Sequence, residues 1–280
     1  MLNRHASVVT HALPGVAMNT QTSYRSSSLR KYRRPRVLGW AVASIVLFWA
    51  WRGAEIQPGA LIDNAGDMAR LAGDFFPPRI GNLDVYVAQM LVTVQMALLS
   101  TLLAAILAIP CACLSLREMT PWWVHRPVRG LMRACHTVHE LVFAMLFVFA
   151  LGQGPFAGTL ALLVPTTGLL AKRFSNAMEA SETGMLKSSR ITPRTGFGTL
   201  GLGALPYLAP AWASMSLTRF ETNLRSATVL GMVGGGGIGV SLWETLRGFQ
   251  YPETATILLV IVGSIMLLDR VSCGLRKHWR

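Results

Sequence analysis

The strongest constraint on this chain is the stretch from Val85 to Leu116, which contains no Asp, Glu, Lys or Arg. As an α-helix, with a rise of about 1.5 Å per residue, this stretch would be longer than the hydrocarbon core of a bilayer, which is roughly 30 Å thick. So long an uncharged segment is typical of a membrane span. We therefore predict a transmembrane helix here, either tilted or extended into the cytoplasm.

The composition extends this prediction to the rest of the chain. Of its 280 residues, 52% are hydrophobic and 14% are charged, which is more apolar than the usual balance of a soluble domain. Further predicted spans are Val37–Trp51, Val128–Leu151, Phe156–Ala171, Ala204–Thr218 and Thr254–Leu268. The sequence thus predicts an all-α, polytopic integral membrane protein with about six transmembrane helices.

The basic residues, which give a formal net charge of +13, are unevenly placed. Most of them fall within residues 4–36, 117–133, 172–194 and 270–280, at alternate ends of the predicted spans. Because cytoplasmic segments of membrane proteins carry an excess of Lys and Arg, this pattern predicts that both termini are cytoplasmic. Topology accounts for the charge, so we expect no nucleic-acid partner.

Local patterns predict the connections between spans. Residues Ala60–Phe76 place apolar side chains at helical spacing before a Pro-Pro pair, which predicts a helix lying on the outer membrane surface. Gly152–Pro155 predicts a tight outer turn. The four cysteines have no CxxC spacing and are interpreted as small apolar packing residues.

The segment Arg219–Arg225 places charges between two apolar segments, ahead of a glycine run that ends at Gly239. A charge at membrane depth costs roughly 2.5–3.5 kcal/mol on insertion scales, so such residues often mark a solute path. Glu221 and Arg225 would share a helix face and could neutralise each other as a structural pair. Alternatively, Arg219 or Arg225 could offer planar donors to an oxyanion.

Two further patterns are weak evidence for a nucleotide site and for a metal site. Gly234–Gly239 fits G-x-G-x-x-G, but without a preceding strand it favours close helix packing and an irregular backbone lining a cavity over nucleotide binding. His136, His139 and Glu140 have a spacing that could bind a metal, yet they make a poor site without a further partner. We expect no metal, no cofactor and no catalytic residue, so the chain is not an enzyme.

The chain resembles the integral-membrane permease of phosphonate-type ABC importers. The likeness covers roughly Ala88 to Arg270, and its most specific parts are Gln95–Pro110, Gly154–Gly158, Leu205–Pro206, Arg219–Arg225, Thr228–Gly231, Gly235–Gly239 and Ala255–Val260. This resemblance implies a bacterial inner-membrane permease subunit in a homodimer or heterodimer. It also implies a periplasmic binding protein that delivers phosphonate, phosphite, hypophosphite or a related oxyanion, and a pair of cytoplasmic ATP-binding subunits that drive inward transport.

The resemblance assigns roles to two groups of residues. The implied translocation path comprises Glu140, Arg219, Glu221, Asn223, Arg225, Gly235, Gly236, Gly237 and Gly239. The implied ATPase coupling loop includes Glu179, Ala180, Gly184, Lys187, Arg190, Pro193, Leu205 and Pro206. The family's coupling motif, E-A-x-x-x-x-G, places its Glu at Lys187 and its Gly at Pro193 when counted back from Leu205–Pro206, so both hallmark residues are replaced.

The expected organisation follows from these assignments. Residues 1–36 and 271–280 are basic cytoplasmic tails, 37–84 hold the first span and the outer interfacial helix, and 85–270 form the permease core with a cytoplasmic coupling loop at 172–203. Two alternatives stay open. The replaced residues Lys187 and Pro193 favour a degenerate permease partner with impaired ATP coupling, and an ATP-independent secondary transporter or channel is the other.

Overall fold

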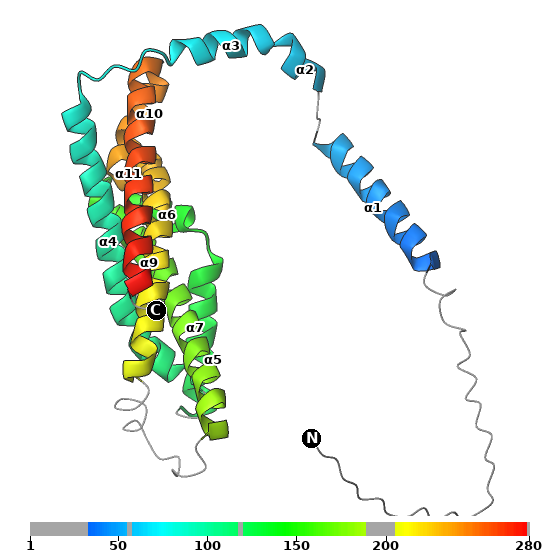
Figure 1. The fold of residues 1–280 in the computed structure, drawn as a ribbon, viewed down its shortest axis with the longest axis vertical. Helices are drawn as coiled ribbons and strands as arrows, with labels where there is room; N and C mark the ends of the chain where they lie inside the picture. Colours follow the sequence, from blue (N-terminus) through cyan, green and yellow to red (C-terminus); the bar gives the residue numbers. More distant parts are fainter. Residues whose placement is uncertain (1–32, 55–57, 117–119, 189–204, 279–280) are drawn as a thin grey trace, which may run out of the picture. The chain divides into compact units, whose positions relative to one another are not determined.

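The computed structural model describes residues 33–54, 58–116, 120–188 and 205–278, and every regular element in them is helical (Figure 1). The predicted coupling residues Arg190 and Pro193 lie outside the described residues. The chain divides into two compact units, Met1–Ala65 and Gly66–Arg280. The second unit contains all of the residues assigned to the path and to coupling.

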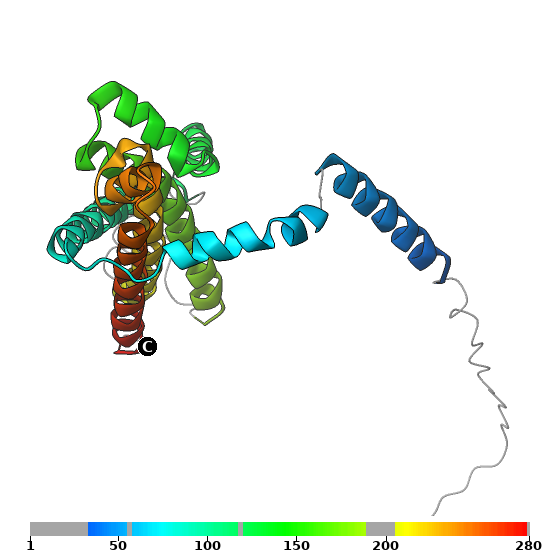
Figure 2. The ribbon, with the colours of Figure 1, turned by 90° about the horizontal axis from the view of Figure 1, so that it is seen from above.

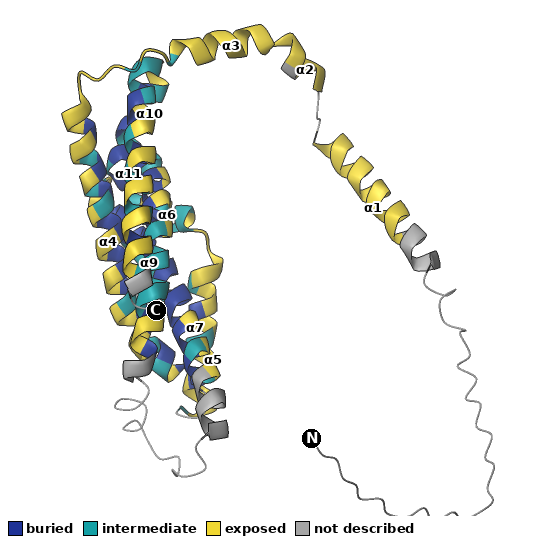
Figure 3. Cartoon of the chain, in the orientation of Figure 1, coloured by how far each residue is buried: buried dark blue, intermediate teal, exposed yellow. Residues whose placement is uncertain are grey.

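The first unit contains α1 (Arg33–Gly53) and α2 (Pro58–Asp63). The predicted span Val37–Trp51 falls within α1. Its described side chains are exposed, including Trp40, Leu47 and Phe48 (Figure 3). An isolated helix with so many exposed apolar side chains suits a lipid environment.

The predicted interfacial helix Ala60–Phe76 corresponds to α2 and α3 (Ala65–Asp74), which are separated by Asn64. None of the residues of α3 is buried. The structure therefore confirms helix in this segment, while its place on the membrane surface remains a prediction.

The second unit is a bundle around α4 (Leu83–Leu114), α7 (Pro155–Ser188), α9 (Leu205–Leu230) and α11 (Tyr251–His278). Figures 1 and 2 show α4, α9 and α11 lying side by side, and α7 packs closely along α4. The buried face of α4 carries small side chains at intervals of one or two turns, Ala97, Ala104, Ala108 and Ala112, all with an exposed fraction of 0%. Small residues at such positions let membrane helices approach closely.

The predicted span Val128–Leu151 is wrong as a single continuous helix. It is divided into α5 (Trp122–Thr137) and α6 (Glu140–Leu151), which are bent by 89°. Val138 and His139 have extended backbone angles, and the His139 Nδ1 atom accepts a 3.2 Å hydrogen bond from the Leu141 N–H. This side chain satisfies an N–H group at the start of α6 and so favours a new helix there.

The helix that contains the predicted fourth span, α7, continues beyond Ala171 to Ser188, so the end of the span within this helix stays a prediction. Residues 172–188 are polar, but they contain no Pro and several good helix formers such as Ala, Met, Glu, Leu and Lys. This local helix propensity accounts for the extension of α7 into the segment predicted as the coupling loop. The first half of the predicted coupling loop 172–203 is therefore helical.

The glycine run breaks the chain direction a second time. The π-helical turn η2 (Gly231–Gly235) follows α9, and α10 (Ile238–Arg247) begins after a bend of 61°. In the part of the chain that the structure describes, α4 and α11 are each long and apolar enough to cross a bilayer; counting each bent pair as one span raises the number from two to four. This number is smaller than the predicted six.

Candidate functional site

A polar cluster lies inside the bundle where α4, α7 and α9 meet. Asn223 on α9 is fully buried and donates a 2.9 Å hydrogen bond from its Nδ2 atom to the Thr101 hydroxyl on α4. Its Oδ1 atom accepts hydrogen bonds from the Thr166 hydroxyl on α7, at 3.1 Å, and from Arg219 Nη2, at 3.3 Å. We call these four residues, Thr101, Thr166, Arg219 and Asn223, the central polar cluster. Its hydrogen bonds offset the cost of burying polar groups.

Arg219 is the charged member of this cluster. Its Nη2 atom also approaches the Thr166 hydroxyl at 3.3 Å, while its Nε atom is buried and has no hydrogen-bond partner among the described residues. Glu140 and Arg173 interact with it electrostatically, and no described carboxylate makes a direct ion pair with it. The Glu140 carboxylate instead accepts a hydrogen bond from Ser226. Arg219 therefore keeps donor capacity for a further acceptor.

The hypothesis that Glu221 and Arg225 neutralise each other is wrong in this structure. Glu221 pairs with Arg276 on α11, and Arg225 Nη2 lies 3.2 Å from Asp269 Oδ2, also on α11. The two side chains start from one helix, but tertiary packing gives each a closer partner. These two ion pairs connect α9 to α11 along their length.

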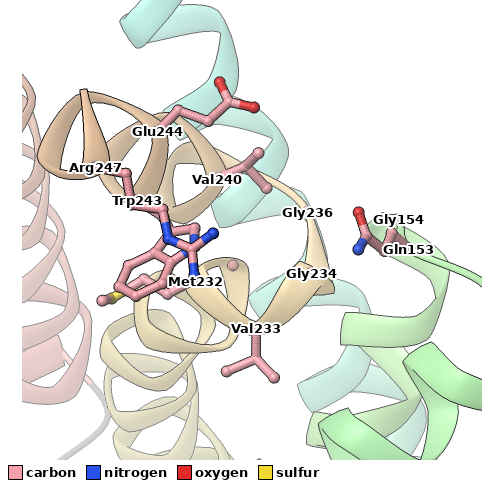
Figure 4. Close-up of a pocket in the computed structure, with 11 residues that line it drawn as sticks. Gln153, Gly154, Met232, Val233, Gly234, Gly236, Val240, Trp243, Glu244 and Arg247 are labelled. Carbon is pink, nitrogen blue, oxygen red and sulfur yellow. The ribbon is translucent and has the colours of Figure 1, made fainter.

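The glycine run borders a cavity of about 690 Å³ (Figure 4). Its lining comes from the α6–α7 turn, η2 and α10, and includes Gln153, Gly234, Gly236, Trp243 and Arg247. The Arg247 guanidinium lies 4.5 Å from the centre of the Trp243 ring. Of the predicted path residues, Gly236 is the one that lines this cavity.

Gly236 is required by its surroundings. It has a φ of 84°, and a Cβ atom at this position would lie 2.7 Å from the Pro155 nitrogen. A side chain would therefore be strained and would collide with the start of α7. The predicted irregular backbone is present here, as the π-helical turn and the positive φ angles show.

The predicted path residues thus occupy separate places. Arg219 and Asn223 belong to the central polar cluster, Glu140 contacts Ser226, Glu221 and Arg225 pair with α11, and Gly235, Gly236, Gly237 and Gly239 form the turn before and into α10. Sequence reasoning missed Thr101 and Thr166. Their signal was a hydroxyl side chain within an apolar helix, which is common and therefore weak.

The predicted coupling segment begins inside α7. Glu179 forms an ion pair with Arg129 of α5, and the Arg129 Nε atom donates to the Ser115 hydroxyl at 3.0 Å. Ala180, Gly184 and Lys187 also lie within α7, and Leu205 and Pro206 begin α9. The Arg129 side chain thus connects the coupling segment to the end of α4.

A helical bundle with candidate membrane-spanning helices and a partly buried guanidinium in its interior is typical of a membrane transport protein. Residues 100–275 match the family described as "Binding-protein-dependent transport system inner membrane component", and the chain belongs to this family. It is therefore a permease subunit of an ABC importer and not an enzyme.

Curated relatives extend the match along the chain. The phosphite transport system permease PtxC of Stutzerimonas stutzeri is 32% identical over 87% of this chain and 92% of its own length. The phosphate-import permease PhnE of Mycolicibacterium smegmatis is 36% identical over 84% of this chain and 44% of its own length. The putative cryptic phosphonate transport system permease PhnE1 of Escherichia coli K12 is 50% identical over 45% of this chain and 61% of its own length.

Solved structures show the same fold. An inward-facing MetNI methionine ABC transporter aligns with a TM-score of 0.58 at 18% identity, covering 71% of this chain and 97% of that chain. An amino acid ABC transporter crystallised with histidines aligns with a TM-score of 0.61 at 12% identity, covering 71% of this chain and 96% of that chain. The predicted all-α permease fold is confirmed.

Family membership fixes the general setting of the chain. It is an inner-membrane component that works with an ATP-binding subunit and a substrate-binding protein. The ATP-independent transporter or channel is not favoured, because the family is defined by binding-protein-dependent transport.

Proposed function

We propose that this chain is the permease that carries a phosphorus oxyanion, such as phosphonate, phosphite or hypophosphite, inward across the membrane. The observation that carries the proposal is the likeness to a phosphite permease along most of both chains. Relatives named for phosphate import and for phosphonate transport support the same class of solute. These solutes share a tetrahedral phosphorus with anionic oxygens.

Arg219 is the residue that we propose contacts the solute. A guanidinium offers several N–H donors in one plane, which suits the oxygens of a phosphorus oxyanion. Thr166 and Asn223 hold one side of this guanidinium, and its Nε atom keeps an unused donor among the described residues. The contact must be weak, since conduction requires a solute to leave as well as to enter.

The other predicted path residues have supporting parts in this proposal. Glu221 and Arg225 hold α9 on α11, and Glu140 limits the local excess of positive charge near Arg219. The glycines around Gly236 permit the bend between η2 and α10 that borders the cavity. This bend is a site at which the bundle could change shape during alternating access.

We propose the following assembly. Two permease subunits, either two copies of this chain or this chain with a second permease, enclose the path. A periplasmic binding protein delivers the solute, and two ATP-binding subunits contact the segment from Glu179 to Pro206. The termini of this chain lie in the cytoplasm, as the distribution of basic residues predicts.

The proposal is tested by reconstituting the permease with its ATP-binding subunits and binding protein in proteoliposomes. Uptake of labelled phosphite and of hypophosphite is measured with and without ATP. We expect ATP-dependent uptake of at least one phosphorus oxyanion, with sulfate as the competing tetrahedral control. Absence of uptake for every phosphorus oxyanion, in a complex that hydrolyses ATP, would overturn the proposal.

A further inference from the structure

Basic side chains gather where the end of α5 packs on α7, within electrostatic range of Arg219 of the central polar cluster. Lys172 and Arg173 lie on α7 and His136 lies in the last turn of α5, and all three are exposed. His136 interacts electrostatically with Lys172, Arg173 and Arg219, and Arg173 also interacts with Arg219. We call His136, Lys172 and Arg173 the basic station. None of its members belongs to the proposed contact at Arg219.

The packing of the helices fixes this arrangement. A Cβ atom at Gly168 would lie 2.8 Å from the Met132 carbonyl oxygen and 3.2 Å from the His136 nitrogen, so the end of α5 lies directly on α7. Lys172 is one helical turn beyond Gly168, and residues four apart share a helix face. On the other side, the hydrogen bond between Thr166 and Arg219 fixes α9 against α7.

The balance of charge at this junction favours an anion. The side chains of Lys172, Arg173 and Arg219 are cationic, and Glu140 is the carboxylate among the charged groups that interact with Arg219. Because a hydrogen bond from Ser226 holds the Glu140 carboxylate, this acid does not directly pair any of the three cations. An excess of two positive charges therefore suits a dianion.

The positions of Thr166 and Lys172 along α7 show how far the basic station lies from the central polar cluster. Counted from Pro155, where α7 begins, Thr166 lies roughly 16 Å along the helix and Lys172 roughly 26 Å. If α7 enters a hydrocarbon core about 30 Å thick at Pro155 and crosses it without tilt, Arg219 beside Thr166 lies near the middle and Lys172 and Arg173 lie near the opposite boundary. Arg219, beside Thr166, and then Lys172 and Arg173 therefore follow one another along α7.

We propose that His136, Lys172 and Arg173 form a second, inner anion site, which receives a dianionic phosphorus oxyanion from Arg219 before its release. This inference rests on the proposed function. Passage through a pore needs several weak sites, since a single strong site would retain the solute. Phosphate groups of anionic lipid headgroups share this chemistry, so the experiment must separate a transported anion from a bound lipid.

The test uses the full complex in proteoliposomes of pure phosphatidylcholine and, in parallel, of phosphatidylcholine with phosphatidylglycerol. The double variant Lys172→Gln with Arg173→Gln is compared with Arg270→Gln, an exposed basic residue of α11 that is outside the site. Uptake is measured at pH 8 for phosphite, which is a dianion there, and for hypophosphite, which is a monoanion. ATP hydrolysis is recorded for every variant.

We expect the double variant to lose about tenfold in phosphite uptake and distinctly less in hypophosphite uptake, because a dianion loses more electrostatic attraction than a monoanion when each cation is removed. The exchange Lys172→Arg with Arg173→Lys should restore the uptake of both, and Arg270→Gln should match the wild type. A purely structural role would lower both solutes equally. Equal losses, or no loss, would overturn the inference.

Two further results are decisive. A loss that appears in the vesicles with phosphatidylglycerol and not in those of pure phosphatidylcholine would assign the basic station to lipid and overturn the inference. Wild-type complex that hydrolyses ATP but imports neither anion would overturn the proposed function and, with it, this inner site. Normal wild-type uptake with an unchanged ratio in the double variant would overturn the inner site alone.

Discussion

At the scale of single residues, Arg219 differs from the other charged residues of α9 in having no direct ion pair among the described residues. Glu221 and Arg225 each have a partner on α11. Sequence spacing placed Arg219, Glu221 and Arg225 in one set, because helical periodicity gives no information about a neighbouring helix. The structure divides this set by the partner that each side chain contacts.

Replacement of Arg219 by Ala is expected to lower ATP-dependent phosphite uptake by about tenfold or more, since hydrogen bonds to charged groups contribute roughly 1.5–3 kcal/mol. Arg219→Lys should recover part of this loss, because it keeps the charge and loses the planar donors. Uptake over a range of solute concentrations in proteoliposomes is the measurement. Arg225→Ala, which removes an exposed ion pair outside the central polar cluster, should lower uptake less. The proposal for Arg219 would be contradicted by a larger loss in Arg225→Ala than in Arg219→Ala.

Asn223 is expected to support the core through its hydrogen bonds. The substitution Asn223→Ala removes the hydrogen bonds that this side chain makes with the Thr101 and Thr166 hydroxyls and with Arg219. Loss of hydrogen bonds in a buried cluster is expected to cost about 1–3 kcal/mol. We expect a lower unfolding temperature for the detergent-solubilised protein, measured by thermal unfolding of its tryptophan fluorescence. Thr222→Ala is the control, since Thr222 is an exposed neighbour on α9 whose hydroxyl bonds to its own helix. Equal unfolding temperatures for both variants would contradict this role.

At the scale of the elements, the sequence located the long helices α4 and α11 and missed the break between α5 and α6. The predicted span Val85–Leu116 agrees closely with α4, and Thr254–Leu268 lies within α11. Apolar length was sufficient there because lipid and core both favour the same side chains. The break between α5 and α6 has no Gly or Pro at Val138 or His139, so a pattern of hydrophobicity could not reveal it. The glycine run did predict the second break.

The glycine bend provides a prediction of its own. The substitution Gly236→Ala places a Cβ atom against Pro155 in a left-handed conformation, at a cost of about 1–3 kcal/mol in backbone strain. We expect lower uptake together with a lower unfolding temperature. Gly263→Ala in α11 is the matched control, because no atom lies within 4 Å of a Cβ atom at that position. Equal uptake and stability in the two variants would show that the bend tolerates a side chain.

The ion pair between Glu221 on α9 and Arg276 on α11 is expected to stabilise the folded protein. A double-mutant cycle of Glu221→Gln and Arg276→Gln measures their coupling, which should be about 1 kcal/mol or more for a pair that is largely shielded from solvent. The readout is thermal unfolding of the purified protein. Additive effects of the two substitutions would mean that the pair contributes no interaction energy.

At the scale of the whole molecule, we propose that ATP hydrolysis moves the spans through the connection between α7 and α9. The described part of that connection is the end of α7, where Glu179 pairs with Arg129 and Arg129 contacts Ser115 at the end of α4. A force on α7 is therefore transmitted to α4 and α5 as well. Sequence comparison with the motif of the family located this segment, although two of its hallmark positions carry Lys187 and Pro193.

Restoring the hallmark residues tests whether this chain is impaired in coupling. If Lys187 and Pro193 weaken the contact with the ATP-binding subunit, the double substitution Lys187→Glu with Pro193→Gly should raise the number of anions imported per ATP hydrolysed. The expected increase is about fivefold, which corresponds to the low end of usual coupling free energies. Parallel measurements of uptake and of phosphate release in one proteoliposome preparation give this ratio. The control is Lys187→Arg, which keeps the charge of the present residue and should leave the ratio unchanged. A ratio that stays constant in the double variant would mean that Lys187 and Pro193 couple as well as the usual Glu and Gly, and the degenerate-partner alternative would then be excluded.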